Sequence, residues 1–125
     1  MKFYLCEKCK NLVYMVEKAS CCTPSCCGQT MTELTPNTVD AALEKHVPVV
    51  TMEGNTIHVV VGSTLHPMTE AHLISFIAIE TTNGVRIKKL TPADEPKACF
   101  VLAEGEKLLE VYEYCNLHGL WKATL

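Results

Sequence analysis

The cysteines of this 125-residue chain are distributed unevenly, and this distribution constrains the fold more than any other feature. Six of the eight cysteines precede Gly28, and only Cys99 and Cys115 follow it, whereas all five histidines lie beyond residue 45. A segment of about 36 residues is too short to close a sufficient hydrophobic core and usually needs a metal or disulfide staple. The sequence therefore predicts a cysteine-rich metal-binding domain at residues 1–36 and a larger domain at residues 37–125.

The composition excludes several classes of protein. A hydrophobic content of 48% and a charged content of 20% are typical of a folded domain. The net charge of −3 argues against a nucleic-acid partner, which would require a basic surface. No apolar run approaches the roughly 20 residues that span a bilayer, and the N-terminus reaches charged residues too early for a signal peptide. We therefore expect a cytoplasmic protein without a membrane partner, whose cysteines are metal thiolates in a reducing compartment.

Beyond residue 37, short apolar runs alternate with turn signals, a pattern that indicates strands. Gly54-Asn55 and Asn83-Gly84 are predicted as two-residue hairpin turns. One short helical turn is expected within residues 37–44, after an Asn or Thr cap. Roughly seven short strands predict an antiparallel β-sandwich. The expected strands are residues 49–53, 56–61, 72–82, 85–90, 98–103, 108–114 and 120–124.

The N-terminal cysteines have the spacing of a metal site. Cys6 and Cys9 are separated by two residues and can present two thiolates to one ion, and a second pair would complete a tetrahedron. Both Cys26–Cys27 and Cys21–Cys22 are candidates for that pair. Adjacent side chains diverge, and iron tolerates the resulting strain at least as well as zinc. A structural zinc site and a dithiol redox motif are the alternatives.

The larger domain contains a second set of candidate ligands. Cys115 and His118 lie three residues apart in a polar turn, and further histidines upstream are next to loops, at His46, His66 and His72. Tetrahedral zinc is complete with four protein ligands, or with three and a water. Five nitrogen and sulfur ligands favour instead a redox iron with one open position. The four imidazoles would then be equatorial and the Cys115 thiolate axial.

Two charged residues next to His46 are candidates for binding substrate and releasing product at that open position. Lys45 would attract and orient a small anion and help to supply a proton through water. Glu44 is a flexible carboxylate that could bind the open position and help to displace product. By contrast, His58 is expected on the polar face of a strand and Cys99 in the core.

Several motifs in the same order resemble those of desulfoferrodoxin, the two-iron form of superoxide reductase, over essentially the whole chain. They are Glu44-Lys45-His46-Val47-Pro48, His66-Pro67-Met68 with His72, and Cys115-Asn116-Leu117-His118-Gly119. Cys6-x-x-Cys9 with Cys26-Cys27-Gly28 is similar to the desulforedoxin-like domain of that family. The resemblance favours Cys26 and Cys27 as the second thiolate pair, because Cys21-Cys22 is not part of the family pattern.

The resemblance also implies a fold and an activity. The fold would be all-β, with a small metal-stapled desulforedoxin-like domain followed by an immunoglobulin-like antiparallel β-sandwich. Iron would be held at two sites, a four-cysteine site made by Cys6, Cys9, Cys26 and Cys27, and a catalytic site made by His46, His66, His72, His118 and Cys115. Glu44 and Lys45 would act beside the catalytic iron. The implied activity is the one-electron reduction of superoxide to hydrogen peroxide by a homodimer that a rubredoxin-like donor supplies with electrons. The alternative is an electron-transfer protein without catalysis.

Overall fold

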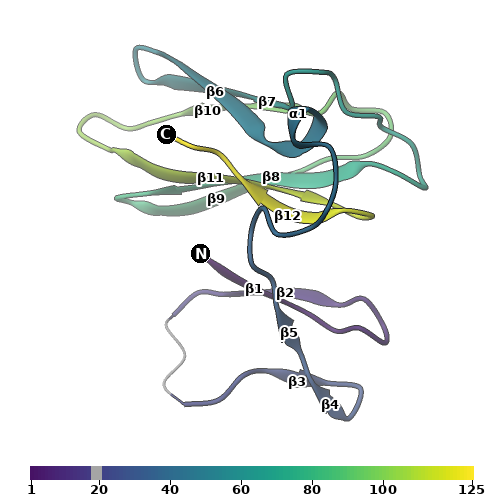
Figure 1. Cartoon of the computed structure of the whole chain (residues 1–125). Coiled ribbons are helices and arrows are strands. Elements are labelled where there is room, and N and C mark those ends of the chain that lie inside the picture. The colour runs from purple at the N-terminus through teal and green to yellow at the C-terminus, as the bar shows by residue number, and fades with distance from the viewer. Residues whose placement is uncertain (18–20) are drawn as a thin grey trace. The chain divides into compact units, whose positions relative to one another are not determined.

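Strands dominate the chain, and they form two compact units. The computed structural model describes residues 1–17 and 21–125, and its units are Met1–Thr35 and Pro36–Leu125. Figure 1 shows the strands of both units and the single-turn helix α1, Leu43–His46. The all-β class predicted from the sequence is confirmed. Among the described residues, no helix has the length and apolar character needed to cross a membrane.

The N-terminal unit consists of very short antiparallel strands. β1, β2 and β5 form one sheet in the order β2-β1-β5, and β3 pairs with β4. Their bounds are Lys2–Leu5 (β1), Leu12–Met15 (β2), Ser25–Cys26 (β3), Gln29–Thr30 (β4) and Thr32–Glu33 (β5). The buried side chains Tyr4, Cys6 and Met31 form a small core. Strands this short carry no reliable period-two pattern, and they were not predicted from the sequence.

The C-terminal unit is a sandwich of two antiparallel sheets, as predicted. One sheet has the order β10-β7-β6 and the other the order β12-β11-β8-β9, and the two sheets form separate layers in Figure 1. The strands are Pro48–Glu53 (β6), Thr56–Val61 (β7), Ile74–Thr81 (β8), Gly84–Lys89 (β9), Lys97–Val101 (β10), Leu108–Cys115 (β11) and Gly119–Lys122 (β12).

Alternating apolar residues of both sheets fill the space between the layers. Ile57, Val59 and Val61 on β7 are fully buried, as are Ile77 and Ile79 on β8. Burying one such side chain stabilises a fold by about 1.5–3 kcal/mol. The sandwich thus has an extensive hydrophobic core of its own.

The helical turn lies later than predicted. It spans Leu43–His46 and starts after Ala42, with no side-chain cap. The Asn37 side chain pairs instead with the backbone of Lys122, because its Nδ2 donates to the carbonyl oxygen at 3.1 Å and its Oδ1 accepts from the N–H at 2.7 Å. The prediction of a capped turn over residues 37–44 was therefore wrong.

One of the two predicted hairpin turns is confirmed, and the other is displaced by one residue. Glu53 pairs with Thr56, so Gly54-Asn55 forms the first turn. In the second hairpin Thr81 pairs with Gly84, and the turn residues are 82–83. The Thr81 hydroxyl accepts a hydrogen bond from the N–H of Asn83 at 3.1 Å and thereby holds the turn at this position.

The outer face of the β10-β7-β6 sheet carries a thiol that was expected in the core. On β10, Ala98 and Phe100 are buried, and Cys99 between them is exposed. Cys99 pairs across the sheet with His58, which is also exposed. The prediction for Cys99 was wrong because side chains alternate between the two faces of a strand and its neighbours fill the inner positions. The polar-face prediction for His58 is confirmed.

Candidate metal centres

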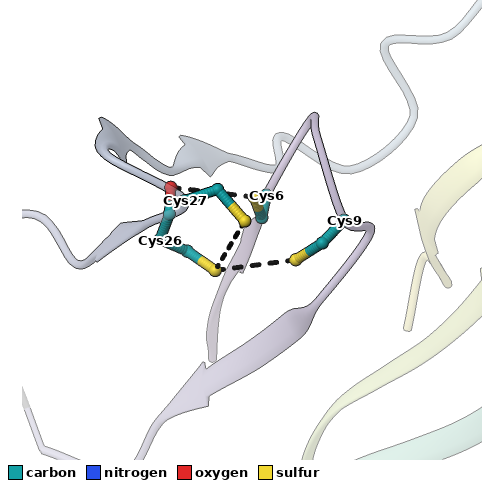
Figure 2. A group of neighbouring side chains, drawn as sticks. All are labelled: Cys6, Cys9, Cys26 and Cys27. Atoms are coloured by element: carbon teal, nitrogen blue, oxygen red, sulfur yellow. Dashed lines mark hydrogen bonds between the residues drawn. The ribbon is translucent and has the colours of Figure 1, made fainter.

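The first cluster contains the four N-terminal cysteines Cys6, Cys9, Cys26 and Cys27. Their sulfur atoms all lie within 4.8 Å of one another. The Cys26 sulfur is 3.6 Å from that of Cys9 and 3.9 Å from that of Cys27, and Figure 2 shows these side chains converging. Thiolates that share one tetrahedral ion at about 2.3 Å are separated by similar distances.

Two tight turns present these sulfurs. In the first turn, Cys6 donates its N–H to the Asn11 carbonyl and accepts at its own carbonyl from Lys10, both at 2.8 Å. In the second turn, Cys27 and Gly28 have positive φ angles of 52° and 73°. A positive φ is strained for a residue with a Cβ, and here it allows adjacent cysteines to face one centre.

The thiols of this cluster cannot ionise independently. The backbone N–H of Cys9 donates to the Cys6 sulfur and lowers the pKa of Cys6 to about 6. The neighbouring sulfurs of Cys9 and Cys26 raise the pKa of Cys27 to about 12. Because like charges in one place oppose ionisation, only a bound cation would let all four become thiolates. The cluster fits a four-sulfur metal ion such as iron.

The second cluster forms at one end of the sandwich. His46 ends α1 just before β6, His66 and His72 lie in the connection between β7 and β8, and Cys115 is the last residue of β11. His118 lies in the turn between β11 and β12. β6 starts opposite the end of β7, which places His46 next to the connection that carries His66 and His72. β8 starts opposite the end of β11, which places the same connection next to Cys115.

The four imidazoles are arranged as a square. Ring centroids are 4.8 Å apart for His46 and His66, 4.5 Å for His66 and His72, 5.0 Å for His72 and His118, and 4.8 Å for His118 and His46. The separation of 6.4 Å between His46 and His72 is then a diagonal.

The Cys115 sulfur joins this square. It lies 3.6 Å from Nε2 of His66 and 3.9 Å from Nδ1 of His118. The tightest group of donor atoms, all within 4.8 Å of one another, contains His46, His66, His72 and Cys115, and His118 borders it. The structure therefore brings together all five residues that the sequence proposed for this centre.

Burial changes the pKa values of the groups in this cluster. Burial is the main cause that lowers the pKa of His46 to about 4, and it also lowers the pKa values of His66 and His72. The imidazoles are thus neutral near pH 7, which is the form that binds metals. Burial raises the pKa of Cys115, and a cation would offset that effect. Among residues 1–17 and 21–125, Nε2 of His72 has no hydrogen-bond partner although it is buried. A metal such as iron fits this donor set.

A second layer of residues orients the rings. Nδ1 of His46 faces Oε1 of Glu113 at 3.5 Å, which leaves Nε2 directed to the cluster. The Trp121 ring stacks on His46 at 4.9 Å, and its Nε1 donates to the His118 carbonyl at 3.0 Å. Nδ1 of His66 is 2.6 Å from the Pro67 carbonyl oxygen. Such contacts select the nitrogen that each imidazole offers to a metal.

Glu113 is the residue of this centre that the sequence reasoning missed. It is fully buried, and burial raises the pKa of its carboxyl well above the ordinary value. A signal for it does exist in the sequence. Glu113 lies midway between Val111 and Cys115, which are both inward-facing, and alternation puts all three on the same face of β11.

Gly62 lets α1 approach the β7–β8 connection. Its φ is +79°, and a Cβ at this position would lie 2.6 Å from the carbonyl oxygens of Glu44 and Thr64. Two backbone hydrogen bonds hold the two segments together. The N–H of Gly62 donates to the Val47 carbonyl at 3.1 Å, and the N–H of Thr64 donates to the Glu44 carbonyl at 3.0 Å. Only glycine fits here without displacing the helix that carries His46.

The two charged residues proposed for the open position lie on α1 and are exposed. Lys45 precedes His46 in α1, and its positive charge is among the smaller causes that lower the pKa values of His46, His66 and His72. For Glu44, the backbone carbonyl rather than the carboxylate makes the contacts with Ser63 and Thr64. Its exposed side chain takes no part in these contacts.

Comparisons with known proteins agree on one family. The desulfoferrodoxin family profile matches residues 38–124. A desulfoferrodoxin from Syntrophotalea carbinolica is 45% identical over 98% of this chain and 95% of its own length. The crystal structure of the superoxide reductase from Treponema pallidum matches with a TM-score of 0.80 and 35% identity over 98% of both chains. A superoxide reductase of the 1Fe type from Giardia intestinalis matches with a TM-score of 0.56 and 36% identity, over 63% of this chain and 94% of that one.

The family binds two irons, and this chain has two sites able to hold them. One is the four-cysteine cluster, and the other is the cluster around Cys115 with three histidines as its tightest partners. Together with the matches in sequence and structure, these sites identify the protein: the chain belongs to the desulfoferrodoxin family.

Proposed function

We propose that this protein is a superoxide reductase, an oxidoreductase that converts superoxide to hydrogen peroxide with one electron and two protons. The catalytic iron would be held by His46, His66, His72, His118 and Cys115. The observation that carries the proposal is the square of four imidazoles with the Cys115 sulfur against it, beside an exposed lysine. The names of the matching structures from Treponema pallidum and Giardia intestinalis support it.

The residues of the chain have distinct roles in this proposal. Iron held at this site would supply the electron, and the side chains of the protein supply charge, position and protons. Lys45 attracts the superoxide anion and passes a proton to it through water, since an ammonium group near the site raises the local concentration of anions. Glu44 is a mobile carboxylate that helps product to leave. His46 and His66, both 2% exposed, are held rigidly by the fold.

Further parts of the proposal concern the rest of the molecule. Residues 37–125 would be the catalytic domain, and residues 1–36 would be a desulforedoxin-like domain with iron bound by Cys6, Cys9, Cys26 and Cys27. A rubredoxin-like protein would donate the electrons, and the protein would act as a cytoplasmic homodimer. The domain boundary follows from the distribution of the cysteines, and the electron donor and the homodimer follow from the resemblance to the family.

A stoichiometric assay tests the activity. The iron-loaded protein and an excess of a one-electron reductant are mixed with superoxide, and peroxide and oxygen are both measured. We expect one peroxide per superoxide consumed and no oxygen released. Release of oxygen would make the protein a dismutase. An electron-transfer protein with a closed iron would consume little superoxide, and its ferric spectrum would not respond to azide.

The Cys115→Ser variant tests the sulfur ligand, with Cys99→Ser as its matched control. Cys99 is exposed on β10, whereas Cys115 is buried in the cluster. We expect Cys115→Ser to abolish both the visible absorption band from thiolate to ferric iron and the activity, and Cys99→Ser to change neither. If Cys115→Ser retained the band, the assignment of the sulfur ligand would be wrong.

The Lys45→Ala variant tests the cation, with Lys107→Ala as its control. Lys107 precedes β11, at the opposite end of that strand from Cys115. We expect Lys45→Ala to slow the bimolecular reaction with superoxide by about threefold to tenfold and to weaken its dependence on salt. Equal rates for the two variants would remove Lys45 from the proposal.

A further inference from the structure

The proposed function leaves one pair of thiols unused. Cys21 and Cys22 are adjacent in the chain, both are exposed, and their sulfur atoms are 3.1 Å apart. They belong to the N-terminal unit, but they are not part of its group of four metal-binding cysteines.

The separation of these sulfurs differs from that of the metal-binding pairs in the same unit. Cys26 and Cys27 are also adjacent, yet their sulfurs are 3.9 Å apart, and the Cys26 and Cys9 sulfurs are 3.6 Å apart. These longer distances suit two corners of a tetrahedron around one ion. At 3.1 Å, the sulfurs of Cys21 and Cys22 are too close for that arrangement and are instead poised to bond with each other, at about 2.05 Å in a disulfide.

The contact between the two thiols also favours reaction. The hydrogen bond with Cys21 raises the pKa of Cys22, so Cys22 keeps its proton and can donate it to the neighbouring sulfur. A thiolate is the form of cysteine that reacts with peroxides, and a protonated neighbour can supply the proton that the departing hydroxide takes up. Exposure of both side chains gives a small oxidant direct access.

We propose that Cys21 and Cys22 form a peroxide-sensitive dithiol that hydrogen peroxide oxidises to a vicinal disulfide. In the first step the Cys21 thiolate attacks one peroxide oxygen, the O–O bond breaks, and a sulfenic acid and water form after uptake of a proton. In the second step the Cys22 sulfur displaces the sulfenic hydroxyl as a second water. Two electrons pass from the two sulfurs to one peroxide. The inference does not depend on the proposed function, because the peroxide can be added.

The disulfide formed in this way would be easily reversed. Adjacent Cα atoms across a trans peptide are about 3.8 Å apart, whereas most disulfides join Cα atoms that are about 4.4–6.8 Å apart. A ring of this size is therefore strained, and strained exposed disulfides are readily reduced by dithiols. The pair would act as a reversible modification site.

A backbone hydrogen bond anchors the chain between the dithiol and the metal-binding pair Cys26–Cys27. Pro24, between the two groups, accepts a hydrogen bond from the N–H of Met31 at 2.9 Å. Met31 belongs to the small core of the unit, so this bond anchors the chain just before Cys26. Metal bound by Cys26 and Cys27 would protect those thiols from oxidation.

Peroxide titration of the iron-loaded full chain tests the proposal. After each addition, free thiols are alkylated, the protein is digested, and fragment masses are read for residues 21, 22 and 99. We expect one equivalent of peroxide to block Cys21 and Cys22 together with a loss of two hydrogen masses, and dithiothreitol to restore both thiols. Cys99 is the internal control, an exposed thiol expected to react at least about tenfold more slowly because it lacks an adjacent thiol.

Single variants separate this reaction from other thiol chemistry. In Cys22→Ser we expect a sulfenic acid at Cys21 that dimedone traps, and in Cys99→Ser we expect the wild-type result. Oxidation of Cys99 before the pair, or a disulfide from Cys21 or Cys22 to Cys26, to Cys27 or to a second chain, would overturn the proposal. The double variant Cys21→Ser, Cys22→Ser should keep its N-terminal metal. Loss of that metal would assign the pair to the metal site and would overturn the proposal too.

Discussion

The two metal centres of this protein are built in opposite ways. In the N-terminal unit the ligands come from two local turns, and the core beside them is small, with Tyr4, Cys6 and Met31 at its centre. In the C-terminal unit the ligands come from distant segments that an extensive hydrophobic core holds at one edge of a sandwich. The contrast indicates, for each unit, whether the metal stabilises the fold or the fold positions the metal ligands. Metal should hold the N-terminal fold together, whereas the C-terminal fold should hold its metal ligands in place.

Removal of metal should have the largest effect, and it should separate the two units. Under reducing conditions with a strong chelator, we expect the N-terminal unit to unfold, because structural metal sites contribute on the order of 10 kcal/mol to small domains. The sandwich should stay folded. Amide NMR spectra measure this, since signals of β1 and β2 should collapse to random-coil positions while those of β7 and β8 stay dispersed. Simultaneous loss of both sets would refute the contrast.

The Gly62→Ala variant should have the next largest effect and bears on the C-terminal side of the comparison. Gly54→Ala is its control, because Gly54 also has a positive φ, of +59°, but has open space where the Cβ would lie. We expect Gly54→Ala to destabilise the unit by about 1–2 kcal/mol. Gly62→Ala should destabilise it by about 1–3 kcal/mol more, because its Cβ meets the carbonyl oxygens of Glu44 and Thr64.

Chemical denaturation and metal affinity measure these two variants. Displacement of α1 in Gly62→Ala should weaken metal binding at the C-terminal centre, whereas Gly54→Ala should leave that affinity unchanged. Equal affinities would mean that His46 does not depend on this close approach.

The Glu113→Leu variant tests whether the buried carboxyl of Glu113 lowers the stability of the metal-free sandwich and raises its affinity for metal. Among the described residues, neither carboxyl oxygen of Glu113 has a hydrogen-bond partner, although Oε1 faces His46. We expect Glu113→Leu to stabilise the metal-free sandwich by about 1–3 kcal/mol and to weaken metal binding about 10- to 100-fold.

Thermal unfolding of the metal-free protein and a metal titration measure the two effects of Glu113→Leu. Glu113→Gln is the matched control, because it keeps a polar group of the same size and should not stabilise the sandwich. A metal-free Glu113→Leu protein that is less stable than wild type would contradict this account of Glu113.

The smallest effect concerns a carboxylate that holds the sandwich without metal. Glu106 accepts hydrogen bonds from the Thr81 hydroxyl, the Ala103 N–H and the Arg86 guanidinium. These contacts, with that of Thr81 foremost, lower its pKa from 4.5 to about 2. A folded-state pKa below the unfolded value stabilises the fold above pH 4.5, and the contribution is lost as the pH falls toward about 2.

Denaturation of wild type and Glu106→Gln between pH 7 and pH 2 measures this effect. The difference in unfolding free energy should be constant above the unfolded pKa and should shrink below it. Glu104→Gln, at an exposed position in the same loop, is the control and should show no such pH dependence. A difference that persisted unchanged at low pH would mean that the Glu106 charge is not its source.

Part of the N-terminal centre can be predicted from the sequence because its determinants are local, although spacing alone left both Cys26–Cys27 and Cys21–Cys22 open as the second pair. The two-residue spacing of Cys6 and Cys9 indicates one tight turn, and Gly28 after Cys27 indicates another. Such turns can direct neighbouring thiols to one centre. The sandwich and the Gly54-Asn55 hairpin are predictable for the same reason, since alternation and turn residues act over a few positions. Where a prediction depended on one residue of register, as for Cys99 and for the second hairpin turn, it was wrong.

The sequence by itself determined which donor groups the chain has and that they occur in loops and at strand ends. Only the tertiary structure decided that four imidazoles form a square with the Cys115 sulfur against it, and that Glu113 lies buried against His46. It also decided that Cys21 and Cys22 contact each other while Cys26 and Cys27 are spread apart. The reason is physical: such distances depend on strand pairing and side-chain packing between residues far apart in the chain, and no local pattern encodes them.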